Sequence, residues 1–216
     1  MTSKKLRYLY LHGFASGPQS SKGRFFRERL LEDGAELELP DLTEGSFERS
    51  TLGQQLRCLE RLVGDDHAVL LGSSMGGYLA ALFAARRPER VSRVVLLAPA
   101  FGLARRWTEQ LGEETVRQWR ERGWRMVHHY GFGDERRVSY ELIREGLQYE
   151  EFPDVRQPAL VAHGRRDESV DYRLSEQFAA GRPNLRLLLY DSDHQLLDVL
   201  EPIWDEVRRF LKLGNS

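Results

Sequence analysis

AVLLGSSMGGYLAAL, residues 68–82, is the strongest structural signal in this chain of 216 residues. Four apolar residues typical of a buried strand run into Gly-x-Ser-x-Gly at residues 72–76, and an alanine-rich helix is expected to begin at Met75. This order of strand, turn and helix places the central serine on a sharp turn, with its hydroxyl above the sheet. The two flanking glycines leave room for a close approach of neighbouring backbone. The stretch therefore predicts that Ser74 is a nucleophile.

Short apolar runs alternate with segments of helical periodicity on both sides of this motif, which is the pattern of βαβ units around a parallel sheet. Because such crossovers are right-handed, the helices should cover both faces of one twisted sheet. We therefore expect a single domain over residues 1–216 with about six strands. The predicted strands are residues 8–11, 35–39, 68–71, 91–97, 159–163 and 185–190. The predicted helices are residues 21–32, 52–63, 75–86, 174–180 and 203–211.

Residues 101–152 break this alternation, because they contain no convincing strand and many arginines and glutamates. We interpret them as a helical insertion. The insertion follows the strand at residues 91–97, at the end of the sheet where ligands collect in open α/β folds, so it is a candidate lid. Its aromatic residues have two open interpretations, substrate contacts or anchors for surface helices. The candidate substrate contacts are Trp107, Trp119 and Trp124.

The composition limits the partners. A formal net charge of −1 gives no overall field that would attract nucleic acid or an anionic membrane. No apolar run approaches the roughly 20 residues that cross a bilayer, and the first apolar stretch lacks the cleavage site of a signal peptide. The single cysteine, Cys58, cannot form an internal disulfide and falls in a predicted amphipathic helix. These features predict a cytoplasmic protein with a small-molecule substrate, and they leave the oligomeric state open.

The first predicted strand ends in YLHGFASGP, residues 10–18. In hydrolases with a Gly-x-Ser-x-Gly turn, the loop after such a strand supplies one backbone amide of the oxyanion hole, and the residue after the nucleophile supplies the other. The amides of Phe14 and Met75 are the predicted pair. His12 directly precedes a glycine at a strand end, and we interpret it as a residue that organises the loop.

Two later loops supply an acid and a base. Asp167 follows the predicted strand at residues 159–163, and His194 follows the one at 185–190, so both should lie at the same edge of the sheet as Ser74. One ring nitrogen of His194 would accept the Ser74 proton while Asp167 holds the other nitrogen and fixes the tautomer. The order Ser, Asp, His along the chain is the order found in hydrolases with such a strand–turn–helix motif around the serine.

Other polar residues near these loops have structural interpretations. Asp171 lies where the next helix starts, a common place for a capping residue. Asp191 and Asp193 are expected to shape a turn. The sequence shows no metal-ligand spacing, so no metal is expected, and a serine triad needs no cofactor. The remaining histidines, His67, His128, His129 and His163, stay unassigned.

These motifs resemble the α/β-hydrolase superfamily, and within it the small YqiA-like esterases. The closer likeness rests on YLHGFASGPQSSK at residues 10–22, LPDL at 39–42 and GSSMGG at 72–77. The resemblance implies an α/β-hydrolase fold, in which a mostly parallel twisted sheet has helices on both faces. It also implies that the triad hydrolyses carboxylic esters or thioesters through an acyl-enzyme, and we expect small to medium acyl groups. The insertion looks longer than compact members carry, which leaves the substrate preference open.

Lys22 and Asp41 match the family pattern, and we interpret them as a pair that ties down the first crossover loop. Two alternatives to an esterase remain. The same triad serves lyase or perhydrolase chemistry in this fold, and a hydrolase scaffold can persist as a non-catalytic binding module. Loss of a triad residue would favour the binding module, and all three residues are present.

Overall fold

Six parallel strands form the central sheet, which a computed structural model describes within residues 5–213. Their order is β2-β1-β3-β4-β7-β8. The chain therefore starts inside the sheet, then adds β2 on one side and β3, β4, β7 and β8 on the other. This order creates a topological switch point between β1 and β3. All six predicted strands are confirmed, although β2 is shorter than expected. The strands are β1 (Leu6–Leu11), β2 (Leu37–Glu38), β3 (His67–Ser73), β4 (Val91–Leu97), β7 (Ala159–Gly164) and β8 (Leu185–Tyr190).

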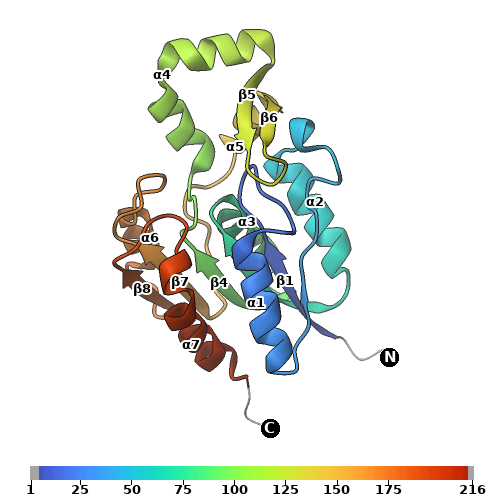
Figure 1. Cartoon of the computed structure of the whole chain (residues 1–216), viewed down its shortest axis with the longest axis vertical. Helices are drawn as coiled ribbons and strands as arrows, with labels where there is room; N and C mark the ends of the chain where they lie inside the picture. Colours follow the sequence, from blue (N-terminus) through green and yellow to red (C-terminus); the bar gives the residue numbers. More distant parts are fainter. Residues whose placement is uncertain (1–4, 214–216) are drawn as a thin grey trace.

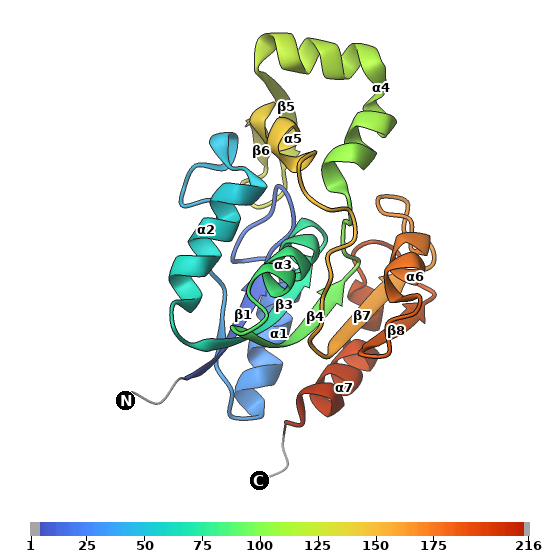
Figure 2. The same ribbon diagram turned by 180° about the vertical axis from the view of Figure 1, so that it is seen from behind.

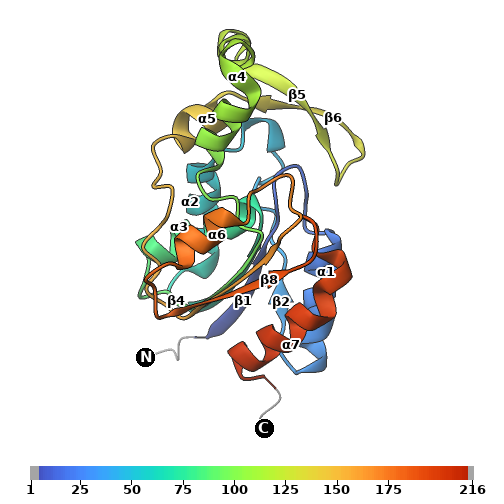
Figure 3. The ribbon, with the colours of Figure 1, turned by 90° about the vertical axis from the view of Figure 1, so that its left-hand side faces the viewer.

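Helices cover both faces of this sheet. Residues of α2, α3 and α6 pack into one hydrophobic core, and residues of α1 and α7 pack into the other, so the two groups lie on opposite sides of the strands (Figure 3). Because both faces are covered, β3 and β7 are buried almost throughout. The helices are α1 (Ser21–Glu32), α2 (Leu52–Val63), α3 (Met75–Arg86), α6 (Arg173–Ala179) and α7 (Leu200–Leu211).

Local sequence explains where the first helices begin. The Ser20 hydroxyl accepts a hydrogen bond from an amide in the first turn of α1, and Thr51 does the same for α2. Cys58 lies on the buried face of α2, as its amphipathic pattern predicted. Short 3₁₀ turns, η1 (Phe47–Arg49) and η2 (Leu197–Val199), precede α2 and α7. In the part of the chain that the structure describes, no helix has both the length and the apolar character to cross a membrane.

The insertion between β4 and β7 stands over the edge at which the strands end (Figures 1 and 2). It begins with α4 (Leu103–Arg122), which bends sharply at Gly112, where the backbone is not helical. An antiparallel hairpin of β5 (Trp124–His129) and β6 (Asp134–Ser139) follows, and α5 (Glu141–Gly146) leads back to the sheet. The prediction of a purely helical insertion over residues 101–152 is therefore wrong, because the hairpin lies in its centre.

Arginines at strand positions make this hairpin look polar in the sequence, so its strands are not predicted. Their charged ends lie over aromatic rings, with Arg125 over Trp119 at 5.3 Å and Arg137 over Trp124 at 4.4 Å from the ring centroids. The aliphatic part of each arginine side chain therefore packs against the ring while its charge stays near solvent. A hydrophobicity pattern that counts arginine as polar does not identify a strand whose arginines pack against aromatic rings. Gly123, in the left-handed conformation, ends α4 and begins the hairpin.

Candidate active site

Ser74 occupies the strained turn that its motif predicts. It follows β3 directly and is the N-cap of α3, with φ 54° and ψ −120°. A positive φ at a residue other than glycine costs about 1–3 kcal/mol, so the surrounding structure must hold this turn in place. The neighbouring glycines make that possible. A Cβ on Gly72 would overlap the carbonyl of Gly76, and a Cβ on Gly76 would overlap the carbonyls of Leu11 and His12.

The loop after β1 lies against this turn. A Cβ built on Gly13 would be 3.4 Å from the Ser74 Cβ and 4.0 Å from its Oγ. Phe14 and Met75, which carry the predicted oxyanion amides, line the same small cavity beside Gly13. Met75 is the first residue of α3, so its amide has no partner within the helix, and the positive end of the helix dipole adds to the site.

His12 organises this loop, as predicted. Its side chain is buried, and Nδ1 lies 3.0 Å from the carbonyl oxygen of Gly13. Because a carbonyl can only accept, Nδ1 carries the proton of this hydrogen bond. Burial lowers the pKa of His12, which favours the neutral ring.

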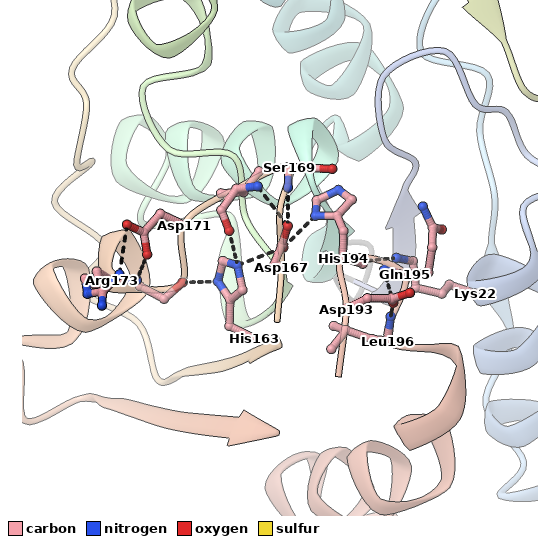
Figure 4. A network of polar contacts seen from close by, with 12 residues as sticks. Lys22, His163, Asp167, Ser169, Asp171, Arg173, Asp193, His194, Gln195 and Leu196 are labelled. Atoms are coloured by element: carbon pink, nitrogen blue, oxygen red, sulfur yellow. Dashed lines mark hydrogen bonds and ion pairs between the residues drawn. The ribbon is translucent and has the colours of Figure 1, made fainter. Parts of the chain in front are cut away.

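The predicted acid and base are in direct contact (Figure 4). Asp167 follows β7 and His194 follows β8, and these strands are neighbours in the sheet. His194 Nδ1 lies 2.6 Å from Asp167 Oδ2. The Asp167 side chain is fully buried, whereas the His194 side chain is 17% exposed, so the imidazole lies between the buried acid and solvent.

Asp167 is held as a carboxylate. Burial alone would raise its pKa, but hydrogen bonds from His163 and His194 outweigh burial and hold the pKa well below its ordinary value. The other oxygen, Oδ1, accepts hydrogen bonds of 2.8 Å from the backbone amides of Ser169 and Val170. The acid is thus ionised at neutral pH and fixed on both oxygens.

Lys22 has a different partner from the one predicted. Its Nζ lies 3.4 Å from the backbone carbonyl oxygen of His194, and burial lowers its pKa to about 8. Asp41 instead accepts hydrogen bonds from Thr43 and Gly45 in its own loop. The predicted pairing of Lys22 with Asp41 is therefore wrong, because α1 points the lysine toward the loop after β8.

The other aspartates have local roles. Asp171 Oδ1 accepts the amide of Arg173 at the start of α6, at 2.9 Å, although the N-cap position itself is Tyr172. Asp193 Oδ1 accepts two amides of its own turn, which confirms its predicted role. Asp191 forms an exposed ion pair with Arg166. Within residues 5–213, no three His, Cys, Asp or Glu side chains are grouped to hold a metal ion.

A cavity of about 250 Å³ opens beside these loops. Ala100, in its wall, donates a backbone hydrogen bond of 3.0 Å to the Ser74 carbonyl, and Val170, also in its wall, donates to Asp167. The cavity therefore adjoins both the serine turn and the acid loop. Most of its lining is apolar, including Phe101 and Trp107.

Of the three candidate tryptophans, Trp107 alone lines this cavity. Its ring meets Phe14 edge-on, with centroids 4.7 Å apart, so it also joins the insertion to the loop after β1. Trp119 is buried and donates its Nε1 hydrogen to the Val138 carbonyl, so it anchors the hairpin to α4. Trp124 lies on the outer side of β5 under an arginine. Trp119 and Trp124 therefore pack within the insertion, and Trp107 remains the candidate substrate contact.

The sequence interpretation missed His163, which contacts the acid from the side opposite His194 (Figure 4). A signal was available, because His163 ends a predicted buried strand and stands four residues before Asp167. A histidine in so apolar a strand needs polar partners, and the nearest polar loop holds the acid.

A family model described as uncharacterised protein family UPF0227 matches residues 7–211. This chain belongs to the UPF0227 family. The match covers nearly all of the chain and confirms the resemblance to YqiA-like α/β-hydrolases drawn from the sequence motifs.

Curated relatives of this UPF0227 protein include the mitochondrial palmitoyl-protein thioesterase ABHD10. The Bos taurus protein is 30% identical over 146 residues, which are 63% of this chain and 47% of that protein. The Homo sapiens protein is 30% identical over 145 residues, with the same shares. The chain thus spans about half the length of the curated relatives it matches.

Solved structures show the fold. Mouse α/β-hydrolase domain-containing protein 10 superposes with a TM-score of 0.77 at 20% identity, covering 98% of this chain and 92% of that chain. Est1E of Butyrivibrio proteoclasticus, with ferulic acid bound, gives a TM-score of 0.79 at 22% identity, covering 97% and 89%. The UPF0227 protein has the α/β-hydrolase fold, and a thioesterase is among its relatives.

Proposed function

We propose that this protein is a serine hydrolase that cleaves carboxylic esters or thioesters of small to medium acyl groups through an acyl-enzyme, with Ser74 as nucleophile, His194 as base and Asp167 as acid. The observation that carries the proposal is the 2.6 Å contact between His194 Nδ1 and the fully buried Asp167 carboxylate. A pair of this kind, at the sheet edge that also carries a strained serine turn, fits nucleophilic catalysis.

The contact between Asp167 and His194 determines which ring nitrogen of His194 carries the hydrogen. Because Asp167 is ionised, it accepts the hydrogen on His194 Nδ1, which leaves the lone pair of Nε2 free to take the Ser74 proton. Ser74 Oγ then attacks the acyl carbonyl, and the amides of Phe14 and Met75 stabilise the oxyanion. Protonated His194 gives its proton to the leaving alcohol or thiol. Water, deprotonated by the same imidazole, clears the acyl-enzyme.

The cavity whose wall includes Ala100, hydrogen-bonded to the Ser74 carbonyl, supports an acyl substrate. About 250 Å³ lined mainly by apolar side chains suits a short or medium acyl chain, with Trp107 as a wall. We include residues 101–152 in the proposal as a lid, because they supply that wall and stand over the site (Figure 2). The name of the ABHD10 relatives adds acyl thioesters to the candidate substrates.

A panel of aryl esters and acyl thioesters of graded chain length tests the proposal. Wild-type protein should hydrolyse the short and medium members, and Ser74→Ala should lose turnover while it keeps its thermal unfolding temperature. Ser73→Ala is the matched control, since it removes the neighbouring hydroxyl, which is buried, and should keep activity. Turnover retained in Ser74→Ala would reject the assignment.

A further inference from the structure

We infer that His163 is a positioning residue that holds Asp167 in the orientation His194 requires, a role that rests on the proposed function. His163 Nε2 lies 3.0 Å from Asp167 Oδ2. This is the same oxygen that His194 Nδ1 contacts at 2.6 Å, so one carboxylate oxygen lies between two imidazoles (Figure 4). His163 itself has no exposed surface, and a buried imidazole stays in place only with its polar atoms paired.

The partners of His163 define its tautomer. Nε2 is also 3.0 Å from the carbonyl oxygen of Val170, and Nδ1 is 2.7 Å from the hydroxyl of Ser175. A carbonyl only accepts, so the hydrogen is on Nε2, where it is shared by the Val170 carbonyl and the carboxylate. The buried Ser175 hydroxyl then donates to Nδ1. A ring with one proton, on Nε2, satisfies all three partners.

This arrangement separates the two imidazoles by role. His163 is fixed as a donor with no exposed surface, whereas the His194 side chain is 17% exposed and is the proposed base. Four donors hold the carboxylate: His163 and His194 on Oδ2, and two backbone amides on Oδ1. If His163 were removed, His194 would be the one remaining donor to Oδ2 among these four. His194 is itself oriented by this carboxylate, so it cannot hold the carboxylate in place.

His163 also ties the acid loop to the scaffold. The ring belongs to β7, and through Val170 and Ser175 it reaches the loop after Asp167 and then α6. Movement of this loop would shift the carboxylate relative to the base. We therefore expect a change at His163 to act on the chemical step more than on substrate binding.

Two substitutions separate positioning from packing. His163→Leu keeps a similar volume and removes the donor, and it should lower kcat about ten- to a hundredfold with an unchanged KM, the range expected for a lost hydrogen bond to a charged group. Labelling of Ser74 by a fluorophosphonate should slow in parallel. His163→Gln can place an amide N–H near the position of Nε2, and it should restore most of the lost kcat. A purely structural role would not produce this rescue at constant KM.

The control is His67→Leu, the same change at the far end of β3, where the strand begins. It should leave kcat and the labelling rate at wild-type values. All rates are scaled to the folded fraction, measured by near-ultraviolet circular dichroism. If folded His163→Leu retains the wild-type kcat and labelling rate, the positioning role is overturned.

A third variant decides the matter if His163→Leu does not fold. Ser175→Ala removes the hydroxyl that fixes the tautomer, and it should lower kcat about two- to tenfold at unchanged KM, as expected for one neutral hydrogen bond. Wild-type kcat in Ser175→Ala would then overturn the inference. The proposed function fails separately, because a wild-type protein that is not labelled at Ser74 would reject the nucleophile, whatever the His163 variants do.

Discussion

Asp167→Asn is the substitution whose effect follows most directly from the geometry. The amides of Ser169 and Val170 donate to Oδ1, so the oxygen of an asparagine side chain must occupy that position. Its NH₂ group is then forced into the position of Oδ2, where it faces His194 Nδ1 and also His163 Nε2, whose hydrogen keeps the Val170 carbonyl as an acceptor. An NH₂ group donates and does not accept, so the hydrogen on His194 must move from Nδ1 to Nε2. In that tautomer the base cannot take a proton from Ser74.

The expected magnitude is large because the backbone amides prevent the asparagine from flipping. The same exchange in a Ser-His-Asp protease, with geometry intact, lowers kcat about 10⁴-fold. A tenfold change in rate corresponds to about 1.4 kcal/mol, so the barrier should rise by about 5 kcal/mol. KM should change little, because Asp167 is fully buried behind the base.

The assay is steady-state hydrolysis of an aryl ester, with the folded fraction checked by thermal unfolding. Asp171 also lines the cavity, so KM is measured together with kcat. Asp171→Asn is the matched control for the acid, since this carboxylate lies four residues further on and accepts the amide of Arg173. It should keep kcat within about twofold. The reasoning is refuted if Asp167→Asn stays within tenfold of wild type, or if Asp171→Asn is the variant that loses activity.

Three further predictions concern packing, charge and the acyl pocket. Gly76→Ala should lower the free energy of unfolding by about 3 kcal/mol in urea titrations, because its Cβ would overlap the backbone carbonyls of Leu11 and His12; an unchanged midpoint would contradict the close approach. Lys22 has a folded-state pKa of about 8, below its ordinary 10.5, so between these pH values the unfolded chain binds more protons and stability rises with pH. Relative to Lys22→Met, wild-type protein should therefore gain about 2 kcal/mol from pH 8 to pH 10, and equal pH dependence would show that the lysine is not desolvated. Trp107→Ala should enlarge the cavity and raise kcat/KM for longer acyl chains relative to short ones about tenfold, and an unchanged chain-length profile would remove Trp107 from the pocket.

The sheet and the acid–base pair could be predicted because they depend on local signals and one topological rule. Buried strands at residues 159–163 and 185–190 each end in a polar loop, and parallel neighbours bring such loops to one edge. The contact between Asp167 and His194 follows from that rule. Similarly, the glycines around Ser74 in the sequence predicted the close backbone packing that the structure shows.

Contacts between distant segments could not be predicted in the same way. Lys22 meets the carbonyl of a residue 172 positions away, and nothing in the local sequence of α1 specifies that partner. The hairpin of β5 and β6 escaped detection because its arginines pack their stems against aromatic rings. Trp119 and Trp124 differ in burial although both are tryptophans in the same insertion, and only tertiary packing separates them.

The most direct test of the account is to locate and time the reaction of the folded protein with a fluorophosphonate by peptide mass spectrometry. We expect a single adduct, on Ser74, that forms at least about a thousandfold more slowly in His194→Ala, because that variant has no base. An adduct on another residue, or labelling of His194→Ala at the wild-type rate, would contradict it.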